Sequence, residues 1–446
     1  MTEIDKNLKN DVCIGCGVCT VNGNFKVKFN QFGEYKAERI NLTDLNSLED
    51  RICPFSSKAK NEDDISSLNF QKLIKKDPYI GNYIGVYAGS AKNNIRVESS
   101  SGGLATSMAL NLMNKGLIEE VYHIEPTNNS EKLFKFSMSN NQEDIIKKCK
   151  SRYYPVTYSD VIETLKKSNK KKLIIGLPCF IKAINLLQIE SPDSVKNIKF
   201  KFAILCGHLK GKFFQQMLIQ DMGLKIDEVT GIDFRHKDKL HSANKYFVKA
   251  NVAEKSKIKG PINLFYGQDW GMGYFKYKAC DYCDDVAGET ADMSFGDAWL
   301  PKYSNDPKGT NIVISRNKIL DKILKEDIKK LDKLDPKDFV NSQLASFKHR
   351  RNGLQARLKN NPIIKKRAIK TIEGDENTDS IYLFRERIRD VSKKFFLFSK
   401  NVKSFLLFKL LMYPFETYYF FLKTRSLKAF IPVTIKAKLT YFFRKK

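Results

Sequence analysis

The chain has 446 residues, which is enough for several domains of ordinary size, each with its own core. Its 78 lysines and arginines exceed its 50 aspartates and glutamates, and the formal net charge of +28 suits an anionic partner without choosing among nucleic acid, acidic lipid and an acidic electron carrier. Residues 1–11 are polar and lack the apolar stretch of a secretory signal, so we expect a protein of the reducing cytoplasm. Nine cysteines, odd in number and closely spaced, then favour metal or redox chemistry over disulfides.

Residues 1–60 form a small unit marked by cysteine and glycine. Cys13, Cys16 and Cys19 follow one another at intervals of three residues, and Cys53, which precedes a proline, supplies a fourth thiol. This spacing is typical of the ligands of one [4Fe–4S] cluster. The intervening glycines would let backbone N–H groups approach the cluster sulfurs. A zinc site normally shows two pairs of ligands, so zinc and plain buried cysteines are the less favoured alternatives.

The middle of the chain alternates short apolar segments with helical patterns. We expect strands at 83–88, 120–124, 172–177 and 200–205, and helices that begin at 104 and that span 160–168, 181–187 and 212–222. This alternation predicts an α/β fold with a mostly parallel sheet covered on both faces. From 227 to 314 the strands are more polar and the loops longer, and 317–333 is predicted to be a basic helix.

A second group of cysteines lies in this region. Cys280 and Cys283 form a Cys-x-x-Cys pair, which serves zinc, iron–sulfur clusters or thiol chemistry. Cys179 and Cys206 each follow the carboxyl end of a predicted parallel strand, where ligands gather in open α/β sheets. These four thiols could hold a second [4Fe–4S] cluster. The alternative is that Cys179 and Cys206 are small apolar residues at strand ends.

Two segments could bind a phosphate group. The first is the turn before the helix at 104, and its candidate residues are Ser100, Ser101, Gly102, Gly103 and Thr106. Glycines allow close backbone approach, and a helix N-terminus presents free N–H groups, although ordinary helix capping explains the pattern equally well. The second segment carries Arg235 and Lys237 at a strand end, where simple solvation is an equal alternative. Beside iron–sulfur clusters, a flavin nucleotide is the ligand that these groups favour.

The C-terminal segment differs from the rest of the chain. Residues 391–446 hold 13 lysines and arginines, 15 aromatic residues and a single acidic residue, Glu416. No uncharged apolar run reaches the ~18 residues of a spanning helix. Interleaved lysine and aromatic side chains favour a helix that lies in the surface of an anionic membrane. A helical subdomain packed on the core, and binding of nucleic acid or another acidic partner, are the alternatives.

Taken in order, these segments resemble the coenzyme F420 hydrogenase/dehydrogenase beta-subunit family, in which F420 is a deazaflavin. The likeness covers roughly residues 10–330. Besides the four cysteines of the N-terminal unit, it rests on Ser100-Ser101-Gly102-Gly103, Ser151-Arg152-Tyr153-Tyr154-Pro155, Gly176-Leu177-Pro178-Cys179, Leu205-Cys206-Gly207, Phe234-Arg235-His236-Lys237, Cys280-Asp281-Tyr282-Cys283 and Asp292-Met293-Ser294-Phe295-Gly296-Asp297.

The resemblance implies a particular domain order. It comprises a ferredoxin-like [4Fe–4S] head at 1–60, the two parts of an α/β flavin-binding catalytic domain at 80–160 and 161–335, and a basic, aromatic helical tail at 336–446. It also implies FAD and a second cluster held by Cys179, Cys206, Cys280 and Cys283. Phe180 stands where the family usually has Gln, and Cys206-Gly207-His208 reorders the common Cys-His-Gly, which weakens the case for a deazaflavin substrate.

The expected function is electron transfer from a ferredoxin-like donor through the clusters to FAD, and then to an organic acceptor, since a flavin converts single electrons into a hydride equivalent. Bacterial members with this kind of head are associated with surface-polysaccharide biosynthesis, which makes a small molecule or glycan precursor the expected acceptor. A non-catalytic electron-transfer subunit is the alternative, and a zinc-stabilised nucleic-acid binder is disfavoured because no nucleic-acid motif is present. The location expected is the cytoplasm, where the tail could hold the protein at the inner face of the membrane. The sequence assigns no catalytic residue.

Overall fold

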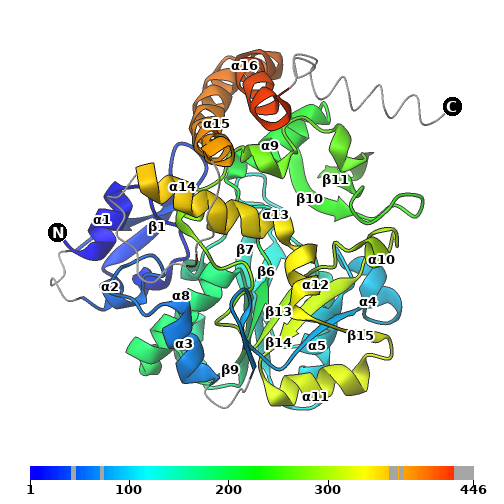
Figure 1. Ribbon diagram of the computed structural model, residues 1–446. Helices are drawn as coiled ribbons and strands as arrows, with labels where there is room; N and C mark the ends of the chain where they lie inside the picture. Colours follow the sequence, from blue (N-terminus) through cyan, green and yellow to red (C-terminus); the bar gives the residue numbers. More distant parts are fainter. Residues whose placement is uncertain (42–46, 71–74, 361–369, 371–375, 426–446) are drawn as a thin grey trace.

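The computed structural model describes the chain except residues 42–46, 71–74, 361–369, 371–375 and 426–446 (Figure 1). At its centre is an eight-stranded sheet. The strands, in spatial order, are β15 (Leu331–Leu334), β5 (Gly85–Gly89), β14 (Asn311–Ser315), β13 (Met293–Asp297), β9 (Ile198–Ile204), β8 (Lys172–Gly176), β6 (Glu120–Pro126) and β7 (Phe134–Ser139). Both parts of the expected catalytic domain contribute strands, so they share one sheet.

The sheet is mixed, and the expectation of a mostly parallel sheet was wrong. The central pairs β6–β8, β8–β9 and β9–β13 run parallel. Antiparallel neighbours flank them, with β7 on one side and β14, β5 and β15 on the other. The apolar run Ile312-Val313-Ile314 of β14 is buried like that of a central parallel strand, so burial does not reveal its direction. The direction of β14 depends on the path of long loops that no local pattern encodes.

Both faces of the sheet are covered, as expected. Along β5, Val86 and Ala88 face one core cluster while Tyr87 faces another, because successive side chains of a strand point to opposite faces. One face packs against α5 (Leu104–Asn114), α6 (Gln142–Lys147) and α11 (Lys318–Asp327). The other packs against α8 (Pro178–Glu190), α12 (Pro336–Ser342) and α13 (Leu344–Phe347).

Two local expectations need correction. The segment 317–333 is not one helix: α11 ends at Asp327 and β15 follows. Leu331 and Leu334 face different core clusters, so the end of this segment has the period of a strand and pairs with β5. In addition, a short helix, α4 (Asn93–Glu98), lies between β5 and the serine–glycine turn.

The N-terminal unit packs directly on the sheet domain. It comprises α1 (Glu3–Lys9), η1 (Val18–Thr20), β1 (Phe25–Phe29), β2 (Tyr35–Arg39) and α2 (Leu48–Ile52), and α3 (Glu62–Asn69) follows it. Val12, Ile14 and Val18 belong to the same apolar core as α8. The backbone N–H of Tyr158 also donates to the carbonyl oxygen of Cys16, with N···O 2.7 Å. This unit is therefore held against the body by a shared core.

The remaining elements surround the sheet. They are β3 (Lys75–Asp77), β4 (Gly81–Tyr83), η2 (Tyr158–Asp160), α7 (Ile162–Lys167), η3 (Pro192–Ser194), α9 (Lys212–Asp221), β10 (Val229–His236), β11 (Phe247–Val252), β12 (Lys255–Lys259), η4 (Ile262–Leu264), η5 (Trp270–Met272), η6 (Lys278–Tyr282), α10 (Pro301–Ser304), the π-helical turn η7 (Lys348–Asn352) and α14 (Gly353–Asn360). The chain then forms two long helices, α15 (Glu376–Asn401) and α16 (Phe405–Thr424), which lie side by side at one end of the molecule beside α9 (Figure 1).

These two helices pack on the core, which is the second of the three arrangements considered for the tail. Phe396 of α15 and Phe408, Met412 and Tyr419 of α16 are buried in the main apolar cluster. The ring of Phe396 lies 5.0 Å from that of Phe213 in α9, centroid to centroid. The last part of the tail, 426–446, lies outside the described residues.

Candidate functional site

The structure brings the four cysteines of the N-terminal unit together. Cys13 and Cys16 lie in the loop after α1, Cys19 lies in η1, and Cys53 caps the end of α2. Burial raises the pKa of the Cys19 thiol well above its usual value, and the other three thiols raise it further. These side chains thus lie within electrostatic range of one another in a desolvated pocket.

Two glycines shape the loop that carries these cysteines. Gly15 has φ +65° and Gly17 has φ +85°, in the left-handed region that favours glycine. A Cβ on Gly17 would lie 2.3 Å from Oγ1 of Thr157, in the sheet domain. The backbone N–H of Gly15 donates to Sγ of Cys13 at 3.3 Å. The loop therefore presents N–H groups to sulfur, as expected, and it also needs glycine for close packing against the body.

The second group of cysteines also meets, although its members come from distant parts of the chain. Cys179 lies in the first turn of α8, Cys206 follows β9, Cys280 lies in η6 and Cys283 follows it. Burial raises the pKa of the Cys179 thiol well above its usual value, and Cys283, Cys206 and Cys280 add to the effect. The backbone N–H of Leu209 donates to Sγ of Cys280 at 3.3 Å.

Arg350, in the π-helical turn η7, lies against this second group. Its side chain is 3% exposed. Nη1 donates to Sγ of Cys283 at 2.7 Å, and Nη2 donates to the carbonyl oxygens of Cys206 at 2.8 Å and Gly207 at 3.0 Å. Sequence reasoning missed this residue, because Arg350 belongs to a basic run with no recognisable motif and reaches the cysteines only through the fold.

The donor set suits iron–sulfur clusters. Each group supplies four thiols, which is the ligand set of a [4Fe–4S] cluster. Burial raises the pKa of Cys53 to about 11 and that of Cys206 to about 12, so both are neutral thiols in the absence of metal. Binding of iron would release their protons, and the iron ions would supply the positive charge that balances the buried thiolates. In the described part of the chain, no group of three or more His, Cys, Asp or Glu side chains closes around a single metal ion. Ligands at the corners of a cubane are farther apart than those of a single ion.

Two buried tyrosines, Tyr158 and Tyr277, lie within electrostatic range of both groups. Burial raises the pKa of Tyr158 well above its usual value, and Cys16 of the first group and Cys179 of the second raise it further. The pKa of Tyr277 is likewise raised by burial, then by Glu34, and also by a thiol of each group. The Tyr277 hydroxyl accepts from the backbone N–H of Tyr35, with N···O 2.7 Å. Each of these two rings therefore lies within electrostatic range of a thiol of both groups.

The candidate phosphate residues come together at the end of β10. Nζ of Lys237 donates to the carbonyl oxygen of Ser101 at 2.7 Å and to that of Arg96. Burial, together with the cations Lys150, Arg235 and Arg96, lowers the pKa of Lys237 to about 7. Ser100 and Lys237 also line one small pocket. A buried cation held beside other cations favours an anionic ligand.

Among the other candidate phosphate-binding residues, Gly102 and Arg235 have structural roles. A Cβ on Gly102 would lie 2.6 Å from the backbone N of Asn311, so this glycine is needed for packing against β14. Oδ1 of Asn311 accepts a hydrogen bond from the backbone N–H of Leu104 at 2.9 Å. This N–H is one of those at the start of α5 that have no partner within the helix. Arg235 is held by Asp297 in a bidentate pair at 2.6 and 2.9 Å. Thr106, in the first turn of α5, is half-buried. Lys237, with Ser100 and Ser101, is the part of this set best placed for an anion.

Comparison with protein families identifies the chain. A model of the coenzyme F420 hydrogenase/dehydrogenase beta-subunit N-terminus matches residues 86–163, and a model of the C-terminus of the same subunit matches residues 169–338. Together they cover more than half of the chain. The chain belongs to this family. Family members are parts of oxidoreductase complexes and are associated with iron–sulfur clusters, so the resemblance and a redox role are both confirmed.

Individual relatives are distant. Two uncharacterized proteins of Methanocaldococcus jannaschii, MJ1349 and MJ0725, are each 23% identical, over 56% and 55% of this chain. The matched part spans 64% of the length of MJ1349 and 90% of that of MJ0725. A chain of the F420-reducing [NiFe] hydrogenase complex from Methanosarcina barkeri, solved with xenon, has 16% identity and a TM-score of 0.49 over 68% of this chain and 99% of its own.

Proposed function

We propose that this protein passes electrons from a ferredoxin-like donor through two [4Fe–4S] clusters to FAD, and from there to an organic acceptor. The observation that carries the proposal is the gathering of eight thiols into two groups of four, with Tyr158 and Tyr277 each near a thiol of both groups. Clusters bound there would transfer one electron at a time. Because Tyr158 and Tyr277 each lie near a thiol of both groups, we propose direct transfer between the clusters.

The two groups of thiolates would be stabilised by different neighbouring residues. In the N-terminal unit, backbone N–H groups aimed at sulfur, such as that of Gly15, stabilise negative charge on the thiolates. Around the second group, the Arg350 guanidinium provides a full positive charge beside Cys283. Two cysteines of each group are buried and the other two are partly buried, which limits the access of water to the sulfurs.

We place the FAD phosphates at the serine–glycine turn, with Lys237 as their cationic partner. Its lowered pKa supports this placement, because an anion would remove the unfavourable charge crowding that Lys150, Arg235 and Arg96 create. FAD would exchange single electrons for a hydride equivalent. The positive net charge of the chain suits an acidic ferredoxin as donor. A glycan precursor as acceptor is proposed on the resemblance alone.

The test is anaerobic reconstitution with iron and sulfide. The proposal predicts about eight irons per chain, EPR signals from two reduced clusters, and bound flavin. Cys53→Ala and Cys206→Ala should each remove one cluster signal and about half of the iron. Cys149→Ala is the matched control, because Cys149 is a buried free cysteine outside both groups and its thiol donates to the carbonyl oxygen of Glu98.

The outcomes distinguish this proposal from a zinc site and from a non-catalytic electron-transfer subunit. Zinc without sulfide at either four-thiol group would refute the cluster proposal. Clusters that form and bleach with reduced ferredoxin, in a protein that reduces no small acceptor, would instead identify an electron-transfer subunit that serves a partner enzyme.

A further inference from the structure

The outer face of the α15–α16 hairpin is apolar and exposed. Five large hydrophobic side chains, which we call the hairpin ridge, are 38–67% exposed: Phe398, Val402, Leu406, Leu410 and Tyr413. Leu406, Leu410 and Tyr413 are spaced at i, i+4 and i+7, and therefore lie on one face of α16. Phe398 lies near the end of α15 and Val402 in the turn to α16, a few residues before this face. Isolated exposed leucines are ordinary, but several large exposed apolar side chains on one short hairpin indicate an interaction surface.

The inner face of the same hairpin is firmly attached. Oη of Tyr274 donates to Oε1 of Glu416 at 2.6 Å, and Lys409 forms an ion pair with Asp221 at 3.0 Å. Phe396 and Phe408 fill the core beneath. The ridge is therefore presented on a fixed support rather than on a free tail.

The exposed charge around the ridge is mostly positive, and the exposed carboxylate nearest to it in the chain is that of Asp390 in α15, which is paired with Arg389. Lys394, Lys400, Lys403 and Lys423 are exposed on this hairpin. Between 391 and 425 the sequence has a single acidic residue, Glu416, and that carboxylate is buried against Tyr274. The exposed hairpin surface after residue 390 thus combines apolar side chains and ammonium groups without an exposed carboxylate.

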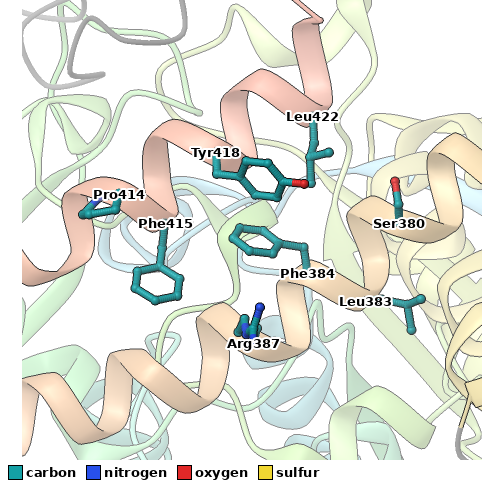
Figure 2. Close-up of a pocket in the computed structure, with 8 residues that line it drawn as sticks. All are labelled: Ser380, Leu383, Phe384, Arg387, Pro414, Phe415, Tyr418 and Leu422. Atoms are coloured by element: carbon teal, nitrogen blue, oxygen red, sulfur yellow. The ribbon is translucent and has the colours of Figure 1, made fainter.

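An open groove of about 650 Å³ between the two helices adds further apolar surface (Figure 2). The rings of Phe384 in α15 and Tyr418 in α16 lie between the helices, with centroids 4.8 Å apart. Pro414 and Phe415 line the same groove, and Tyr418 is half exposed. Aromatic side chains with a polar tip suit the headgroup region of a bilayer.

We infer that this hairpin docks on an anionic lipid surface, with the ridge in the headgroup–acyl boundary and the lysines on lipid phosphates. The ridge favours lipid over nucleic acid, because leucine and valine gain nothing from a phosphate backbone. The excess of exposed lysines favours an anionic bilayer over an ordinary protein face. Within the described residues, no helix is long and apolar enough to cross a bilayer. The inference does not depend on the proposed redox function.

The test is flotation of the full-length protein with vesicles of phosphatidylcholine alone and of phosphatidylcholine mixed with phosphatidylglycerol. Binding is expected to the mixed vesicles and to weaken at high salt. Leu406→Ser with Leu410→Ser should weaken binding at least tenfold. Lys394→Gln with Lys403→Gln should weaken it about fivefold per lysine.

Controls separate the hairpin from the rest of the chain. Leu240→Ser removes an apolar side chain that is 90% exposed elsewhere, and Lys322→Gln removes an exposed lysine on α11; both should bind like the parent. All variants keep residues 426–446, and thermal unfolding verifies their fold. The inference is overturned if the parent fails to float with anionic vesicles. It is also overturned if the folded leucine variant floats as well as the parent, or if purified partner protein or nucleic acid is bound through the ridge while vesicles are not.

Discussion

Replacement of Arg350 by glutamine should lower the reduction potential of the second cluster. The guanidinium donates to Sγ of Cys283 at 2.7 Å and is buried, so water screens it little. A reduced cluster carries one more negative charge than an oxidised one, and the nearby cation therefore stabilises the reduced form. At a separation of roughly 5 Å and an effective dielectric constant of about 20, one unit charge contributes about 3 kcal/mol. For a one-electron couple this corresponds to a decrease of roughly 130 mV.

The measurement is an EPR-monitored redox titration of the reconstituted protein. Arg350→Lys keeps the charge and should shift the potential less than Arg350→Gln. Arg351→Gln is the matched control, because Arg351 is equally buried but donates to the carbonyl oxygens of Pro78 and Tyr79. If Arg350→Gln retains the cluster signal with an unchanged or higher potential, the electrostatic reasoning is wrong.

Three further outcomes are expected. Gly17→Ala should destabilise the chain by at least about 1–3 kcal/mol in denaturant titration, since its Cβ meets Thr157 in a left-handed turn; Gly23→Ala, equally left-handed but with open space around it, should be milder. Flavin-nucleotide affinity, measured by fluorescence, should fall as the pH rises through about 7, because Lys237 then loses its proton, and Lys237→Gln should flatten this dependence. Asp281→Asn should lower the unfolding free energy by about 3–5 kcal/mol, since one lysine and two arginines buried around it would lose their counter-charge.

Local spacing was enough to predict the first group of thiols. Cys13, Cys16 and Cys19 lie on one short loop, so their separation in the chain already constrains their separation in space. The same holds for the strand and helix around Cys179, where short periodic patterns predicted β8 and α8 to within a few residues at most ends. Antiparallel pairing of β14 with β5 could not be predicted this way, because the partners are more than two hundred residues apart.

By itself, the sequence determined the two cysteine motifs, the alternation of strands and helices and the basic, aromatic character of the tail, since each is a property of neighbouring residues. Only the tertiary structure decided that Arg350 reaches Cys283 across 67 residues, that Tyr158 and Tyr277 each lie near thiols of both groups, and that α16 buries Phe408 while it exposes Leu406. The physical reason is that burial and charge pairing depend on which distant segments share a core, and a local pattern does not contain that information.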